Sequence, residues 1–180
     1  SRRPEEPHAP VTTYGRQIAD AERAISCWDG QVAIVRFTKI VGMAHPLFAG
    51  WAETLKKGEP IHPFSDMVFA PVSLKCAVSV LRLVAELRLA GVWQVSGHRD
   101  VSYAEAARWG AQVLGADERL VEPVSAHAQG FGAEPIPVHT TLNVDRLRSA
   151  LGVEPPDVRW TIEAAFAQLH PAVELARSSP

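Results

Sequence analysis

The chain has 180 residues, of which 47% are hydrophobic and 21% are charged, the composition of a folded globular protein rather than a disordered one. Its formal net charge is -2, and without a cluster of Lys and Arg this excludes a basic surface for nucleic acid. The sequence shows no signal peptide and no apolar run of about 18 residues, so we expect no membrane segment and a cytoplasmic location.

The first predicted element is a helix that follows a proline-rich loop containing Pro4, Pro7 and Pro10. Two consecutive threonines at 12–13 could cap its first turn. Apolar side chains recur at offsets of four, three, four and three residues, which predicts a helix packed along one face. The residues on that face are Tyr14, Ile18, Ala21, Ile25 and Trp28.

A run of β-branched and other apolar residues at 31–37 follows the turn at Asp29 and Gly30. Such a run predicts a parallel strand that is buried on both faces. Because a helix, a short turn and a buried strand make half of a parallel α/β unit, this region predicts the α/β class.

Two further helices are predicted from their ends and their apolar faces. Residues 46–57 have proline in the first turn and Gly58 at the end. The next helix has Ser73 as its cap and is closed by Gly91. We expect these core-facing residues: Leu47, Trp51 and Leu55 in the first helix, and Leu74, Ala77, Val78, Leu81, Val84 and Leu87 in the second.

The rest of the chain predicts a short strand, three helices and a long loop. The strand spans 92–97, and Ser102 and Glu105 form a capping box that opens a helix to about Leu114. Residues 117–137 show little pattern and predict a loop. Asn143 caps a small helix that Gly152 ends, and 161–169 form the last helix.

The cysteines and histidines indicate neither a disulfide nor a metal site. Cys27 and Cys76 fall inside apolar helical patterns, so we expect buried free thiols. None of the seven His pairs with another at i+3 or i+4, and we expect no metal. The letters His-Arg-Asp at 98–100 match a kinase catalytic loop, but Glu105 replaces its Asn and no glycine loop is present, so we reject that interpretation.

The pattern Tyr-Gly-x-x-x-Ala-x-x-Glu at 14–22 resembles the active-site helix of the extended short-chain dehydrogenase/reductases that act on nucleotide sugars. Further segments resemble the same family in the same order: Arg-x-x-x-x-Val-Gly at 36–42, the strand ending in Ser-Gly at 96–97, and Leu-Asn…Leu-Gly between 142 and 152. The resemblance is nearest to the dTDP-4-dehydrorhamnose reductase group and covers nearly the whole chain.

The resemblance implies an α/β fold consisting of the later half of a Rossmann-like parallel sheet with a small mixed α+β substrate-binding lobe. Residues 1–41 would end the dinucleotide-binding domain, 42–66 would belong to the substrate lobe, 67–91 would form the return strand and helix, and 92–180 would form the C-terminal substrate-binding lobe. It also implies NAD(P)H as the cofactor and a nucleotide sugar as the substrate.

The resemblance also assigns roles to individual residues. Tyr14 would donate the proton, and position 18 is where the family has its catalytic Lys. The residues expected at the cofactor are Tyr14, Arg36 and Thr38, and those expected at the substrate are Lys39, Trp51 and Asp66. From its residue type alone, Arg36 could equally serve in a structural ion pair.

The chain departs from the family at Ile18, which stands in place of that Lys. A phenol titrates near pH ~10, so ionising it at neutral pH costs about 4 kcal/mol, which a neighbouring ammonium group would supply. Ile18 has no charge, and Lys39 from a later loop is the alternative source. The sequence also lacks the glycine-rich turn between a strand and a helix that binds a pyrophosphate.

These departures lead to two hypotheses. The chain is a truncated or degenerate nucleotide-sugar reductase that is weak or inactive as it stands, or it is a non-catalytic binding or regulatory subunit of a partner enzyme. Half of a parallel sheet has an open edge, so we also expect self-association. A homo-oligomer, a missing N-terminal half and a partner subunit all remain open, and we expect no partner of nucleic acid or membrane.

Overall fold

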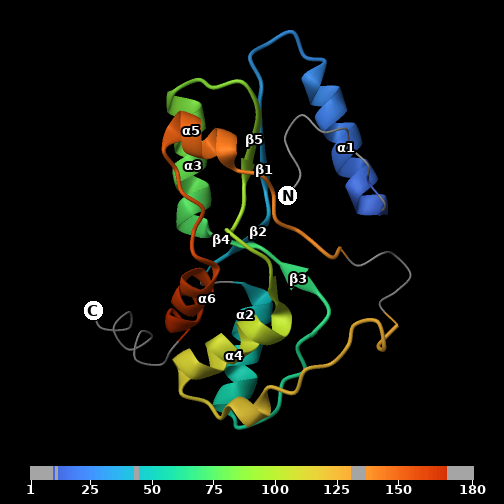
Figure 1. The fold of residues 1–180 in the computed structure, drawn as a ribbon, viewed down its shortest axis with the longest axis vertical. Coiled ribbons are helices and arrows are strands. Elements are labelled where there is room, and N and C mark those ends of the chain that lie inside the picture. The colour runs from blue at the N-terminus through green and yellow to red at the C-terminus, as the bar shows by residue number, and fades with distance from the viewer. Residues whose placement is uncertain (1–9, 11, 43–44, 131–136, 170–180) are drawn as a thin grey trace.

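The computed structural model describes residues 10, 12–42, 45–130 and 137–169. Most of the predicted proline-rich entry loop and part of the predicted loop at 117–137 therefore lie outside the described residues. Figure 1 shows two regions: one contains β1 and β5 between α1 and the α3–α5 pair, and the other contains α2, α4 and α6. No helix in the described ranges is long and apolar enough to cross a membrane.

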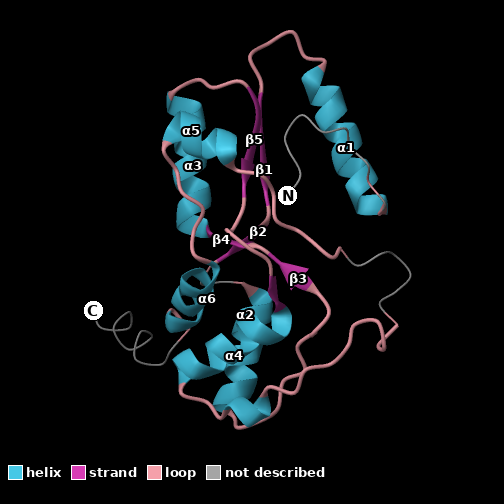
Figure 2. Cartoon of the chain, viewed as in Figure 1, coloured by secondary structure: helices cyan, strands magenta, loops and turns pink. Residues whose placement is uncertain are grey.

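Three pairs of strands organise the fold. Strand β1 (Ala33–Phe37) runs parallel to β5 (Gly91–Val95), in register from Ala33 opposite Gly91 to Phe37 opposite Val95. Strand β2 (Lys39–Val41) runs parallel to β4 (Pro71–Ser73), and β3 (Val68–Phe69) pairs antiparallel with β6 (Val101–Ser102). The predicted α/β class with parallel strands is confirmed (Figure 2).

Strand β1 is less buried than its apolar sequence predicts. Each of its five residues is only partly buried, whereas Trp93 and Val95 of the neighbouring β5 are fully covered. The expectation of a strand covered on both faces is therefore wrong in the described chain. Helix α3 packs against β1. On the edge of β1 that faces away from β5, the described residues place no further strand.

Helix α1 (Thr13–Ser26) forms where predicted, but its apolar face is not covered. Thr12 caps the helix, because its Oγ1 accepts a hydrogen bond from the Gly15 amide at 3.0 Å. Among the helix residues only Ala19 is buried. The predicted packed face is exposed: Tyr14 by 72%, Ile18 by 43%, Ile25 by 47% and Trp28 by 75%. Periodicity shows which side chains share a face, but it cannot show that another layer lies against them.

Helix α3 (Leu74–Glu86) also differs from its predicted face and end. Ser73 caps it through a 3.1 Å bond from the Cys76 amide, as predicted. Its buried residues are Ala77, Val80 and Val84, while Leu74, Val78, Leu81 and Leu87 are exposed. The helix ends at Glu86 rather than near Gly91, which begins β5 instead. The turn between them uses Arg88, a non-glycine residue with φ of 48°.

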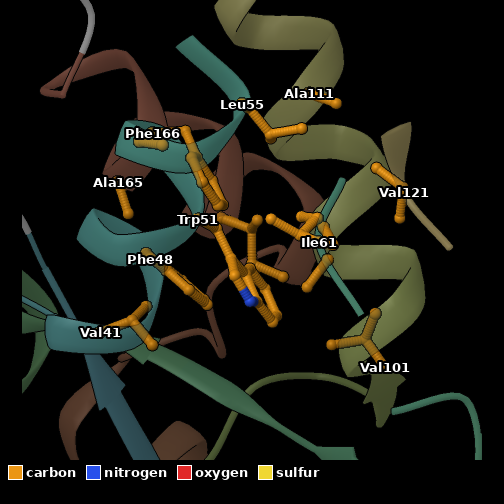
Figure 3. Packing of buried hydrophobic residues seen from close by; sticks show 14 of the residues in the cluster. Val41, Phe48, Trp51, Leu55, Ile61, Val101, Ala111, Val121, Ala165 and Phe166 are labelled. Carbon is orange, nitrogen blue, oxygen red and sulfur yellow. The ribbon is translucent and has the colours of Figure 1, made fainter. Parts of the chain in front are cut away.

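The larger core lies between α2 (Pro46–Lys56), α4 (Tyr103–Leu114) and α6 (Val158–Ala167), and Figure 3 shows their side chains meeting there. Phe48 stacks on Phe166 with ring centroids 4.9 Å apart. Gly110 allows α6 to approach α4, because a Cβ there would lie 2.4 Å from the Phe166 ring. Trp51 and Leu55 are buried as predicted, but Leu47 is 38% exposed.

The predicted helix caps are mostly confirmed in the second half of the chain. The capping box of Ser102 and Glu105 is present at α4, and Gly152 ends α5 (Asp145–Leu151) with φ of 62°. Asn143 lies one residue before the N-cap position and accepts from the Asp145 amide. Helix α6 begins earlier than predicted, because the Asp157 carboxylate caps it by accepting from the Trp160 amide.

The predicted loop after α4 contains a short 3-10 helix, η1 (Glu118–Leu120). Beyond it, Val121 and Val124 form parallel bridges to Ile61 and Phe64. Both cysteines are free, but Cys27 is exposed rather than buried and Cys76 is partly buried. Burial raises the pKa of the Cys76 thiol above its ordinary value.

Candidate functional site

Tyr14 and Ile18 lie one turn apart on the exposed face of α1, as the helical spacing requires. The nearest arginines in sequence bind elsewhere: Arg16 donates to the Thr13 hydroxyl and Arg23 pairs with Asp20. No described cation forms a bond with the Tyr14 phenol. The phenol and the aliphatic side chain beside it therefore face open space on this helix.

Arg36 connects β1 to α1 instead of projecting into an open site. Its guanidinium group donates from Nε to both Glu22 carboxylate oxygens, at 3.0 and 3.1 Å, and from Nη2 to Oε2 at 2.7 Å. Both side chains are largely covered. The bidentate geometry indicates a structural ion pair, the alternative that the residue type left open, which holds α1 against the strand.

Thr38 lies just beyond the carboxyl end of β1, and its amide donates to the Val95 carbonyl at 3.1 Å. Its hydroxyl Oγ1 is buried and has no hydrogen-bond partner among the described residues. A buried hydroxyl without a partner is unfavourable unless a ligand or water satisfies it. Thr38 is therefore the residue of the expected cofactor set that has a buried polar group without a described partner.

Lys39 follows directly and meets a residue that the sequence analysis did not select. Its Nζ lies 3.3 Å from the Tyr103 Oη and 5.6 Å from the centroid of the Tyr103 ring. The buried His45 Nδ1 also lacks a described partner, and its pKa is lowered by burial and then by the charge of Lys39. Lys39 therefore makes the end of β1 locally positive.

A cavity of about 210 Å³ lies beside Tyr103. Aromatic and apolar side chains form most of its wall: Leu47, Trp51, His62, Pro63, Phe64, Met67 and Tyr103. The expected substrate residue Trp51 is thus brought to the same place as Lys39, through their shared neighbour Tyr103, whose ring meets the Trp51 ring edge-on at 6.4 Å. The only local signal at Tyr103 is the capping box before it, which positions a backbone but not a side chain.

Asp66, the third expected substrate residue, is bound to a neighbouring loop. Its carboxylate accepts from the Ser125 hydroxyl at 2.5 Å and from the amides of Ala126 and His127 at 2.7 and 3.2 Å. These bonds, the one from Ser125 first, lower the pKa of Asp66 to about 2. Asp66 thus holds the loop after Val124 beside the cavity wall.

The structure therefore brings Lys39 and Trp51 together through Tyr103, with Thr38 next to Lys39 in the chain. Tyr14 and Ile18 lie on α1, which Figure 1 shows on the far side of the β1–β5 pair from α3 and α5. Across the described ranges, no group of three or more His, Cys, Asp or Glu gathers as a metal site. The Thr38 hydroxyl is a buried hydrogen-bonding group without a described partner at the strand end, and the sequence has no glycine-rich turn of the kind that binds a pyrophosphate.

Parallel strands flanked by helices, followed along the chain by a helical lobe, define a Rossmann-like α/β fold. The chain belongs to the RmlD substrate binding domain family, which matches residues 2–170. No curated protein matches the chain.

Solved structures share the fold at low sequence identity. The dTDP-4-dehydrorhamnose reductase of Bacillus anthracis, in complex with NADP, is 21% identical, with a TM-score of 0.77 over 89% of this chain and 57% of that one. The Bordetella bronchiseptica enzyme WbmG, in complex with NAD, is 24% identical, with a TM-score of 0.76 over 92% and 52%. The dTDP-glucose 4,6-dehydratase of Bacillus anthracis, in complex with NAD, is 16% identical, with a TM-score of 0.75 over 94% and 56%. The chain spans about half the length of these structures.

Proposed function

We propose that the chain is the substrate-binding half of an NAD(P)-dependent reductase of nucleotide-activated sugars, and that it catalyses 4-keto reduction weakly or not at all as it stands. The observation that carries the proposal is the contact of Lys39, just beyond β1, with Tyr103 in the wall of the aromatic cavity, while the Arg36–Glu22 ion pair holds α1 against β1. The family match over residues 2–170 supports it. A cytoplasmic location is part of the same proposal.

Reduction of a ketone to an alcohol needs a hydride on carbon and a proton on oxygen. A bound NAD(P)H would supply the hydride, and Thr38 is the described residue whose free hydroxyl would help to hold it. Tyr14 would supply the proton. Lys39 and Trp51 would hold the substrate, and Asp66 would keep the adjacent loop in place.

The weak activity follows from the surroundings of Tyr14. Proton transfer from a phenol is efficient when a nearby positive charge stabilises the phenolate that forms. Ile18 supplies no charge, and the only described cation just beyond β1, Lys39, is bonded to Tyr103 instead. Tyr14 is also 72% exposed, so water screens any more distant charge.

The test is a titration of the chain with NADPH, in which nicotinamide fluorescence reports binding, followed by addition of a 4-keto nucleotide sugar. We expect weak cofactor binding and slow or undetectable oxidation of NADPH. Rapid hydride transfer by the 180 residues alone would overturn the proposed loss of activity. If the nucleotide sugar also failed to bind, the proposed substrate class would be wrong.

A second candidate function is that of a non-catalytic binding or regulatory subunit. The exposed apolar faces of α1 and α3 favour it, because such faces are usually covered in a stable assembly. The reductase and the non-catalytic subunit can be told apart by measuring complex formation and turnover of the sugar. A stoichiometric complex with a partner enzyme, without turnover of the sugar, supports the subunit, whereas turnover supports the reductase.

A further inference from the structure

An apolar groove of about 450 Å³ lies between α3 and α6, where the two regions of the fold meet (Figure 1). Leu74 and Val78 line its α3 side, and Trp160 and Ala164 line its α6 side. The large side chains among them are exposed: Leu74 by 57%, Val78 by 56% and Trp160 by 60%. A further apolar segment bound here would remove this apolar area from water.

The described residues end at the edge of the groove. Gln168, the C-cap of α6, lines the groove, and Leu169 is the last described residue. Residues 170–180 follow, outside the described residues. Pro171 has no amide hydrogen and disfavours the helical conformation of the residue before it, so the sequence favours a change of chain direction after α6. The chain that leaves α6 therefore begins beside the groove.

The segment after Leu169 is long enough to run back along α6. From Trp160 to Gln168 the helix and its cap rise about 12 Å, at about 1.5 Å per residue. An extended chain covers about 3.3 Å per residue, so about four residues span that distance. Residues 172–176 read Ala-Val-Glu-Leu-Ala, which provides this length and apolar side chains. The segment thus matches the groove in both length and apolar character.

The charges of the groove and the segment are also complementary. Among the described residues that line the groove, the charged one is Lys75, which is exposed. The segment has Glu174 between Val173 and Leu175. An ammonium group beside an apolar surface favours a partner with a carboxylate. Pairing this face with the same face of a second copy would bring two Lys75 side chains to one interface, so a second copy is the weaker competitor for the groove.

We propose that residues 170–180 bind in the groove between α3 and α6. Val173 and Leu175 contact its apolar wall, and Glu174 pairs with Lys75. Bound there, the segment joins the region that contains the strands to the helical region and fixes one relative to the other. It also occupies a surface that a second copy of the chain would otherwise contact. This role is separate from the binding of cofactor and substrate.

The test follows Trp160 in the full chain by fluorine NMR, with fluorotryptophan at the Trp positions and Trp160→Phe to assign its resonance. The shift of this resonance between light and heavy water measures how far solvent reaches the ring. The variants are Glu174→Lys, Lys75→Glu and the two combined. Glu59→Lys, at an exposed position outside the groove, is the matched control. Circular dichroism melting checks that each variant is folded.

We expect the solvent shift of Trp160 to be roughly twofold smaller in the full chain than in a chain truncated after Leu169, because the segment excludes water from the ring. Glu174→Lys and Lys75→Glu should each increase the shift, since each brings like charges together. The double variant should restore the wild-type shift, because the two charges are exchanged. Glu59→Lys should leave it unchanged.

Equal solvent shifts in the full and truncated chains would overturn the proposal. A Trp160 shift that falls only as the protein concentration rises would also overturn it, because a second copy would then cover the groove. Sedimentation velocity on the same samples measures that association. If the truncated chain does not fold, the charge exchange decides, and a double variant without recovery contradicts the proposal. None of these results alters the NADPH titration that tests the proposed function.

Discussion

At the scale of single residues, position 18 decides what Tyr14 can do. Lysine at this position would place an ammonium group one helical turn from the phenol, on the same exposed face of α1. We expect Ile18→Lys to raise turnover of a 4-keto nucleotide sugar at least tenfold when a dinucleotide-binding half is supplied. The rate of NADPH oxidation in the presence of the sugar measures the turnover.

Ile25→Lys is the control for Ile18→Lys, since residue 25 lies on the same face two turns further along and has similar exposure. It should leave turnover unchanged. If Ile18→Lys gives no gain in the reconstituted protein, Tyr14 is not the proton donor.

Gly110 is required for the contact between α4 and α6. Gly110→Ala would place a Cβ 2.4 Å from the Phe166 ring, so we expect overpacking to destabilise the protein by about 1–3 kcal/mol. Urea unfolding followed by circular dichroism measures the change. Gly50→Ala in α2, where the added Cβ meets nothing within 4 Å, should instead stabilise by about 0.5–1 kcal/mol. Equal effects at both sites would contradict the packing described.

Asp66 makes the docking of its loop depend on pH. Hydrogen bonds from Ser125 and the following amides lower its pKa from 3.8 to about 2. Because the folded-state value is the lower one, the stabilisation is present above pH 3.8 and is lost as the pH falls through about 2. The urea concentration at the midpoint of unfolding should therefore be lower for Asp66→Asn than for the wild type near pH ~5. Near pH ~2 the two midpoints should become equal.

The control for Asp66→Asn is Asp29→Asn, in the exposed turn after α1, which should leave the urea midpoint unchanged. If the difference in urea midpoint between the wild type and Asp66→Asn is as large near pH ~2 as near pH ~5, the negative charge of Asp66 is not what holds the loop.

At the scale of elements, α1 and α3 each carry apolar side chains that the described chain does not cover. On α3 these include Leu74, Val78 and Leu81. An apolar groove of about 450 Å³ continues from this helix across β2 to Trp160 on α6. Exposed faces of this kind promote association, because covering them removes apolar area from water.

We therefore expect a double variant, Val78→Lys with Leu81→Glu, to lower self-association without unfolding α3. The changed residues are exposed, so the buried contacts of Ala77, Val80 and Val84 remain. Sedimentation velocity measures the change in association. Arg82→Ala, on the exposed side of the same helix, is the control and should not reduce it.

At the scale of the whole molecule, the two-stranded β1–β5 pair is protected on one edge only. Arg146 of α5 covers the β5 side, donating to the carbonyls of Val92 and Ala90 and lying over the Trp93 ring at 4.1 Å. Beside β1, the described chain places no further strand. We expect the isolated chain to sediment as more than a monomer, because an open parallel edge pairs with other chains. A compact monomer at high concentration would contradict this.

Supplying a parallel dinucleotide-binding unit should suppress that self-association. Such a unit would pair with the free edge of β1 and cover the apolar faces of α1 and α3 together. Co-expression of this unit with the chain, followed by size-exclusion chromatography, measures the outcome. Association that continues unchanged in the presence of the unit would show that another surface is responsible.

The sequence by itself determined the order of the helices, the strands β1 and β5, most helix caps and the absence of an ammonium group at position 18. These are local properties, since a cap such as Ser73 or Ser102 acts on amides within three residues. It did not predict the end of α3 at Glu86 or the start of α6 at Val158, although the Asp157 cap of α6 also acts within three residues.

Only the tertiary structure decided which apolar faces are covered and which polar residues meet. Periodicity put Tyr14 and Val78 on apolar faces, but their coverage depends on what other segments lie there. Likewise Lys39 meets Tyr103, and Asp66 meets Ser125, only because folding closes gaps of 64 and 59 residues. Side chains that distant in sequence have no local pattern to connect them, so these two contacts became visible only in the folded chain.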